Sequence, residues 1–161
     1  MNKTHDPMQR AFDEAKAAAL RGEVPVGAVI VKDGVLLAAN GNRTLEVKDP
    51  TAHAEILVIR EASQRLGSER LIGCDLYITL EPCAMCAGAI SFARLRRVYF
   101  AASDPKGGAV DNGPRCFSSP TCHHAPDVYS GIRESEGGEI LRQFFSAKRL
   151  ETHGQTPAGE E

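Results

Sequence analysis

Two short motifs contain the residue types that bind metal ions in proteins. His53-Ala54-Glu55 lies near the start of one predicted helix, and Pro82-Cys83-Ala84-Met85-Cys86 lies near the start of another. The two cysteines are three residues apart, which places both sulfurs on one face of a helical turn. One imidazole and two thiolates suit zinc and leave the fourth tetrahedral position for water. The motifs therefore predict an open zinc site with His53, Cys83 and Cys86 as ligands.

An open zinc site of this kind predicts hydrolytic chemistry. Zinc lowers the pKa of a bound water to about 7, so hydroxide forms at neutral pH. Glu55 is the candidate catalytic residue, because its carboxylate can take a proton from that water and pass protons to the substrate and the leaving group. A regular helix would separate the side chains of His53 and Glu55 by about 200°. We therefore expect His53 at the very start of the helix, where irregular dihedrals let both side chains face one cavity.

A closed structural zinc site is the alternative. It would need a fourth protein ligand in place of water, for which the chain offers Cys116, Cys122, His123 and His124. The five cysteines are odd in number and unevenly spaced, which favours a reduced compartment with a metal site over a disulfide framework. Cys74 is most simply a small core residue of a strand, and Cys116 and Cys122 are more easily explained as thiols without a metal.

The elements that must position these motifs follow from hydrophobic patterning. Two strands around Asp33-Gly34 form a predicted hairpin, because this dipeptide favours a tight hairpin turn. A strand, a helix and a second strand follow the first motif, and parallel strands joined in this way have helical crossovers. The predicted helices are 8–19, 52–66, 84–93 and 139–150, and the predicted strands are 26–31, 35–39, 74–79 and 98–102. This order predicts an α/β fold, a three-layer α/β/α sandwich with a mixed sheet of about five strands.

Length and composition set the remaining bounds. A chain of 161 residues with 42% apolar residues predicts a single domain over 1–150, and the polar residues 151–161 predict a disordered tail. No segment approaches the roughly 20 apolar residues of a membrane span, so we expect a cytoplasmic protein without membrane contact. The net charge of −2 means that a polyanion would need a local basic patch. Four cations lie near Asp104 in sequence and form either such a patch or a solvated face: Arg94, Arg96, Arg97 and Lys106.

The two motifs together match the established H-x-E and P-C-x-x-C pattern of zinc-dependent deaminases at every specified position. Nearly end to end, the chain resembles the bacterial tRNA-specific adenosine deaminases (TadA type) of the cytidine-deaminase superfamily. The segments that carry this resemblance are 23–28, 49–55, 79–83 and 143–145. The resemblance implies a cytidine-deaminase-like fold, one Zn²⁺ per subunit and a homodimer. It also implies hydrolysis of adenosine to inosine at the wobble position of a tRNA anticodon stem-loop, whose splayed bases are readily extracted.

The resemblance also implies which residues bind the substrate. Asn42 would contact the target purine and Asp104 a neighbouring nucleotide, with Ala54 and Phe145 as further substrate-binding residues. From the residues alone, Asn42 is equally explained by turn chemistry and Asp104 by capping of a turn or helix. Phe144 and Phe145 are expected in the core first, with one of them at the border of the pocket.

Two other functions fit parts of this pattern. A deaminase of a free nucleobase such as guanine or cytosine would share the zinc site and differ in how the pocket closes. A catalytically silent RNA-binding or structural zinc module would share the ligands alone. Glu55 argues against the silent module, because a structural zinc site has no use for a carboxylate beside an open metal.

Overall fold

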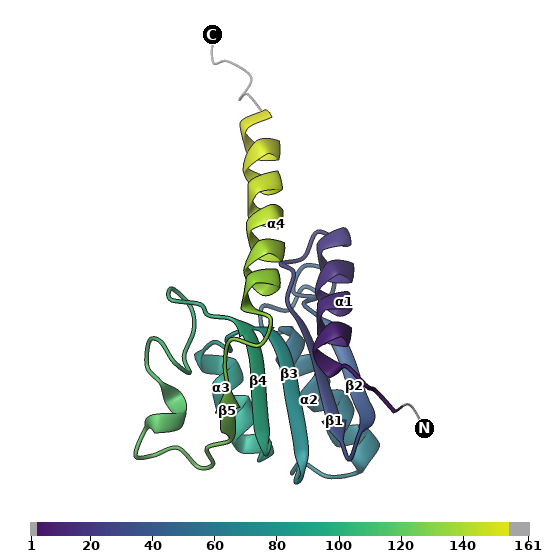
Figure 1. The fold of residues 1–161 in the computed structure, drawn as a ribbon, viewed down its shortest axis with the longest axis vertical. Coiled ribbons are helices and arrows are strands. Elements are labelled where there is room, and N and C mark those ends of the chain that lie inside the picture. The colour runs from purple at the N-terminus through teal and green to yellow at the C-terminus, as the bar shows by residue number, and fades with distance from the viewer. Residues whose placement is uncertain (1–2, 155–161) are drawn as a thin grey trace.

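The computed structural model describes residues 3–154, which form one sheet between two layers of helices (Figure 1). The strands lie in the order β2-β1-β3-β4-β5. The second strand in this order, β1, is antiparallel to both neighbours, whereas β3, β4 and β5 are mutually parallel. The elements are α1 Pro7–Leu20, β1 Gly27–Lys32, β2 Val35–Gly41, α2 Ala54–Leu66, β3 Cys74–Leu80, α3 Ala84–Ala93, β4 Arg97–Ala102, η1 Cys116–Ser118, β5 Asp127–Tyr129 and α4 Glu134–Gly154. The predicted three-layer fold with a mixed five-stranded sheet is confirmed.

Local chemistry explains where the first elements begin and end. Asp6 caps α1 by accepting a hydrogen bond of 3.0 Å from the backbone N–H of Gln9, and Pro7 occupies the first helical position. In the hairpin turn, Asp33 and Gly34 both have positive φ, at 50° and 77°, as the tight turn predicted from this dipeptide requires. The α2 helix ends at Gly67, which has φ of 69°.

Each face of the sheet carries its own hydrophobic core. On one face α1 and the start of α4 pack against β1 and β4, with Phe12, Val29 and Ala101 fully buried. On the other face α2 and α3 cover the sheet, where Val58 and Ile90 meet a larger cluster of strand residues. None of the helices within residues 3–154 is long and apolar enough to cross a membrane.

The last helix approaches the sheet closely at one residue. A Cβ atom added to Gly137 would lie 3.0 Å from the Cβ of Ala101 and from the carbonyl oxygen of Thr79, so a glycine lets α4 pack directly on the strand ends. The helix begins before the predicted residue 139 and leaves the body of the molecule after its first turns (Figure 1). Residues 151–154 are helical, where a disordered tail was predicted, and residues 155–161 lie outside the described part of the chain.

The second motif lies beyond the carboxyl end of the parallel strand β3, and the first motif follows β2, which runs in the same direction as β3. β3 leads through Leu80, Glu81 and Pro82 into α3, and β4 leads into the long segment 103–126. In α/β sheets, ligands bind at this edge. The short β5 strand directly follows that segment and was not predicted.

Candidate active site

His53 and Cys83 each occupy the residue immediately before a helix. His53 precedes α2 with φ of −72° and ψ of 152°, and Cys83 precedes α3 with φ of −73° and ψ of 175°. Both residues are therefore extended rather than helical. The predicted capping position of His53 is confirmed, and its side chain lines the same cavity as that of Glu55.

The three predicted ligands lie together. The Nδ1 atom of His53 is 3.7 Å from the sulfur of Cys83 and 3.5 Å from the sulfur of Cys86. Zinc–nitrogen and zinc–sulfur bonds of ordinary length, at a tetrahedral angle, require a nitrogen–sulfur separation of about 3.6 Å. The donor set and its spacing thus fit one zinc ion. Within residues 3–154 no fourth His, Cys, Asp or Glu joins this group, which argues against a closed structural site.

The three ligand side chains shift one another's pKa values. Hydrogen bonds from Cys86 and His53 lower the pKa of Cys83 to about 4. The hydrogen bond between His53 and Cys83 raises the pKa of His53, and the hydrogen bond between Cys86 and Cys83 raises the pKa of the Cys86 thiol. The surroundings of Cys83 therefore favour its thiolate form. A coordinating cation deprotonates a thiol outright, so zinc would recruit the second sulfur.

Glu55 is buried beside this group. Its side chain is 4% exposed, and desolvation raises the pKa of its carboxyl to about 7. A carboxyl group with this pKa can both accept and donate a proton near neutral pH. Glu55 is not one of the three clustered ligands, so it is available for proton transfer.

A cavity of about 270 Å³ opens over the ligands. Its wall combines both motifs with residues from the loop after β2, from the end of β3 and from the segment after β4. The lining residues are Val24, Val26, Asn42, Thr44, His53, Glu55, Leu80, Glu81, Cys83, Asp104 and Gly107. Two of the predicted substrate-binding residues, Asn42 and Asp104, are among them.

The amide of Asn42 is held in one orientation. Its Oδ1 atom accepts a hydrogen bond of 2.9 Å from the backbone N–H of Ala54, so the Nδ2 amine is the part left to donate to a ligand. Ala54 itself is fully buried and does not line the cavity. The structure thus places Ala54 behind Asn42, with its backbone rather than its side chain taking part.

Asp104 lines two cavities. Its Oδ1 atom accepts hydrogen bonds from the backbone N–H groups of Lys106 and Gly107, at 3.2 and 2.9 Å, which is the turn-capping role expected from its type. It also lines a second cavity of about 580 Å³, formed with α4, which contains Phe145, Arg142 and Arg149. Phe145 is 44% exposed, so it lies at the border of a cavity and not in the core, the second of the two places expected for one of the paired phenylalanines.

Of the two alternatives for the cations near Asp104 in sequence, the basic patch does not form. Arg96 and Arg97 pair with Asp75, at 2.8 and 4.0 Å, and Arg94 donates to the carbonyl oxygen of His123. Of the four cations near Asp104 in sequence, Lys106 alone lines the second cavity. The other cations of that cavity come from α4, a contribution that the sequence analysis missed.

Two buried glutamates also escaped the sequence analysis. Glu23 is 1% exposed and accepts a hydrogen bond of 2.8 Å from the backbone N–H of Leu45, in the loop that carries Thr44. Glu81 is 2% exposed and accepts hydrogen bonds from the segment after β4. Burial opposes ionisation of Glu81, but hydrogen bonds from Asp104 and Asn112 outweigh it and hold the pKa of this carboxyl below its usual range. The sequence did contain one indication of Glu81, because a charged residue stands there between an apolar strand and Pro82.

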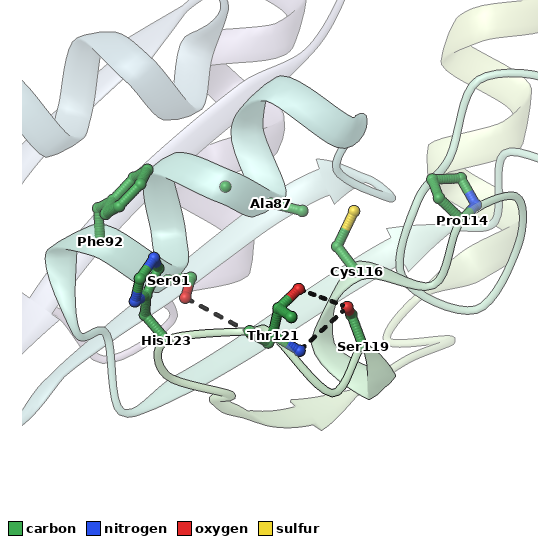
Figure 2. Close-up of a pocket in the computed structure, with 10 residues that line it drawn as sticks. Ala87, Ser91, Phe92, Pro114, Cys116, Ser119, Thr121 and His123 are labelled. Carbon is green, nitrogen blue, oxygen red and sulfur yellow. Dashed lines mark hydrogen bonds between the residues drawn. The ribbon is translucent and has the colours of Figure 1, made fainter.

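A third cavity, of about 290 Å³, lies on the outer side of α3 and is shown in Figure 2. Ala87, Ser91 and Phe92 of the helix face Cys116 and His123 of the long loop. Cys122 also lines this cavity. The cysteines offered as alternative ligands therefore lie in a different cavity from the zinc ligands.

Comparison with known proteins places the chain in a family. Residues 1–149 match the model of the MafB19-like deaminase family. Over 144 residues the chain is 66% identical to the tRNA-specific adenosine deaminase of Agrobacterium fabrum, covering 89% of this chain and 95% of that protein. The chain belongs to the tRNA-specific adenosine deaminases. This membership confirms the resemblance noted from the motifs, and His53, Cys83 and Cys86 form the zinc-binding group of this deaminase.

Solved structures give the same relationship. One, from biochemical and structural studies of A-to-I editing by tRNA:A34 deaminases at the wobble position of transfer RNA, is 65% identical to this deaminase. It superposes with a TM-score of 0.83, covering 84% of this chain and 98% of that chain. A guanine deaminase from Bacillus subtilis is 31% identical, with a TM-score of 0.60 and coverage of 99% of both chains.

Proposed function

We propose that this protein converts adenosine to inosine by hydrolysis at the wobble position of a tRNA anticodon. The observation that carries this proposal is the cavity lined by His53, Cys83 and the buried carboxyl of Glu55, with Cys86 completing the zinc-binding group behind it. The 66% identity to a tRNA-specific adenosine deaminase supplies the substrate class.

The reaction replaces the exocyclic amine of adenine with oxygen from water and releases ammonia. Zinc, when bound, supplies the Lewis acidity that makes water nucleophilic at neutral pH. Glu55 accepts the proton of the attacking water and delivers protons to the adjacent ring nitrogen and to the departing amine. Its burial keeps the carboxyl close to the pH at which it can serve both steps.

The remaining cavity residues hold the nucleotide. The Nδ2 amine of Asn42 donates to an acceptor on the purine edge, and the bond from Ala54 fixes its orientation. Asp104 borders both cavities and accepts from a hydroxyl of the substrate strand. Phe145 offers an aromatic face on which a flanking base stacks, and Lys106, Arg142 and Arg149 face the phosphates of the strand.

Deamination of a free base is the second candidate, because the Bacillus subtilis guanine deaminase shares 31% identity over 99% of the chain. A free base carries no phosphate and gains nothing from a second cavity with three cations. The second cavity shares Val24, Leu80 and Asp104 with the first, so a bound strand can continue from one to the other. This continuity favours an RNA substrate.

One assay separates the two candidates. The zinc-loaded full chain is incubated with an anticodon stem-loop that carries adenosine at the wobble position, and in parallel with free guanine, cytosine and adenine. We expect inosine in the stem-loop and ammonia release from that sample alone. Ammonia from a free base without inosine in the stem-loop would refute the proposed substrate.

A homodimer in the cytoplasm completes the proposal. Phe92 and Met85 on α3 are 69% and 37% exposed, and Ala89 between them lets another helix approach closely. Burial of this apolar face against a second subunit would stabilise a dimer. Sedimentation equilibrium of the native chain tests it, with Phe92→Glu expected to give a monomer. A native chain that sediments as a monomer at micromolar concentration would contradict the dimer.

A further inference from the structure

Glu81 accepts all of its hydrogen bonds from one loop, residues 103–112. It follows β3 and lies two residues before the zinc ligand Cys83, yet it belongs neither to the ligand group nor to the proton-transfer step. Its Oε1 atom accepts from the backbone N–H of Asp104 at 3.0 Å, from Nδ2 of Asn112 at 2.7 Å and from the hydroxyl of Ser103 at 3.3 Å. Its Oε2 atom accepts from the backbone N–H groups of Val110 at 3.1 Å, Asp111 at 3.0 Å and Asn112 at 3.1 Å.

These donors occupy the acceptor capacity of the carboxylate. Two ionised oxygens offer about four lone-pair sites, and six donors converge on them. Glu81 therefore has no acceptor site to offer a substrate, although it borders the cavity. A buried carboxylate without hydrogen bonds is costly, so the loop cannot move away while Glu81 stays buried and charged.

The loop held in this way carries substrate-facing residues. Asp104 and Gly107 lie within it and line the cavity over the zinc ligands. A second bond, of 2.9 Å from the N–H of Ala109 to the carbonyl oxygen of Pro82, ties the same loop to the residue before Cys83. At Gly108 a Cβ atom would come within 2.5 Å of the Glu81 carboxylate, so the loop passes here because it has a glycine.

We propose that Glu81 is a positioning residue for the deamination reaction, which sets the place of Asp104 relative to the zinc ligands by anchoring residues 103–112. The inference rests on the proposed function for the identity of the substrate. Its structural half, the anchoring of the loop, stands independently of any substrate.

Glu81→Gln is the primary test. The isosteric amide replaces one of the two carboxylate oxygens with an NH2 group, a donor that faces the N–H groups of the loop, so about half of the anchor is removed. We expect kcat/KM for the stem-loop to fall between tenfold and a hundredfold, as about 1 Å of misplacement can cause. We expect the loss mainly in KM, with one zinc per chain retained by elemental analysis. Loss of zinc would assign Glu81 to the metal site and overturn the proposal.

A double-mutant cycle tests whether Glu81 acts on the reaction through Asp104. If Glu81 acts through Asp104, then Glu81→Gln combined with Asp104→Ala should cost no more in kcat/KM than Asp104→Ala alone. Effects that multiply would show that Glu81 acts elsewhere, and would overturn the role assigned here. In Gly108→Ala the added Cβ would lie 2.5 Å from both the Glu81 carboxylate and the carbonyl oxygen of Asp104, so it should displace the loop and reproduce the KM increase with Glu81 intact.

A matched control separates positioning from general stability. Asp75 is a mostly buried carboxylate at the opposite end of β3, where it accepts bonds of 3.0 and 2.8 Å from Arg96. Asp75→Asn should lower the melting temperature and leave kcat/KM unchanged. An equal loss of kcat/KM in both variants would make destabilisation the explanation and overturn the proposal.

Hydrogen exchange makes this inference testable apart from the proposed function. In Glu81→Gln the amides of residues 104 and 110–112 should exchange faster than in the native chain, whereas those of α2 should not change. Unchanged exchange in the loop would overturn the anchoring role even if activity falls. A native chain that deaminates guanine and not the stem-loop would refute the proposed function, and the same variants measured on guanine would then test Glu81.

Discussion

A spacing of two residues brings His53 and Glu55 to one cavity because only one of them is helical. His53 keeps extended dihedrals as the residue before α2, and Glu55 is the second residue of the helix. A regular helix would point the two side chains in nearly opposite directions. The same arrangement holds Cys83 outside α3 while Cys86 lies inside it. Helix starts thus let short motifs converge on one ion.

Replacing Glu55 by alanine should separate metal binding from proton transfer. Glu55→Ala removes the proton carrier and leaves the three zinc ligands in place. We expect kcat to fall by roughly 10²- to 10⁴-fold, with zinc content unchanged by elemental analysis. Turnover at the native rate would end the assignment of Glu55. Glu61→Ala serves as control, because Glu61 is a half-buried carboxylate of α2 outside the cavity lining.

Replacing the amide of Asn42 with a carboxylate tests its contact with the purine more specifically than removing the side chain. Asn42→Asp keeps an oxygen for the N–H of Ala54 and replaces the donating amine with a second acceptor. The purine edge then meets an acceptor, so we expect at least a tenfold fall in kcat/KM, or about 1.4 kcal/mol of transition-state stabilisation. Asn40→Asp makes the same change of charge two residues away, outside the cavity lining. Equal losses in both variants would point to charge alone.

Single residues were predictable where a motif fixed their chemistry. The ligands and Glu55 follow from residue type and spacing. Glu81 does not, because its donors lie 22 to 31 residues away and meet it only through the connection of β3 to β4. The sequence also did not decide between the core and the border of a cavity for Phe145, for a related reason. Its helical stripe is apolar, but the outer half of α4 has no sheet beneath it (Figure 1).

At the scale of elements, local patterns predicted most of the fold. The cap of α1, the hairpin turn and the end of α2 follow from Asp6, Asp33-Gly34 and Gly67. The first turn of α4 was missed because Gly137 and Gly138 are poor helix formers. The close contact of Gly137 with Ala101 accompanies helical structure there. β5 has only three residues, too few to show a strand period.

The packing of α1 on β1 depends on another glycine. A Cβ atom at Gly27 would lie 1.9 Å from the carbonyl oxygen of Ala11, so any side chain must push the helix away. We expect Gly27→Ala to destabilise the fold by about 1–3 kcal/mol, measured by urea unfolding. Gly88→Ala, where an added Cβ meets nothing within 4 Å, should be neutral or stabilising. A native-like midpoint for Gly27→Ala would contradict the packing described here.

For the whole molecule, the fold class was predictable and the distribution of charge was not. Arg96 and Arg97 are close to Asp104 in sequence, but β4 separates them. The six residues of β4 span about 20 Å, so the arginines lie at the amino end of the strand and Asp104 lies beyond its carboxyl end. Neighbouring charges in a sequence do not form one patch when a strand runs between them.

The cations beside the cavity should make RNA binding sensitive to salt. Arg142→Ala combined with Arg149→Ala should weaken stem-loop binding and reduce the slope of log K against log salt by about 0.7 for each phosphate that the arginines neutralise. Affinity measured at several salt concentrations checks this slope. Arg70→Ala removes a cation that lies outside both cavities and should leave the slope unchanged. An unaltered slope in the double variant would mean that α4 binds no phosphate.

α4 rests on the sheet at its start, where Gly137 approaches the strands closely, and then projects from the body of the molecule. Arg149 lies twelve residues further on, a distance of about 18 Å along the axis. A tilt of the α4 axis by about 10° about Gly137 would therefore displace Arg149 by about 3 Å, enough to separate it from a bound phosphate. The small residues Gly137 and Ala101 thus contribute to the position of Arg149, although both lie outside the cavity linings.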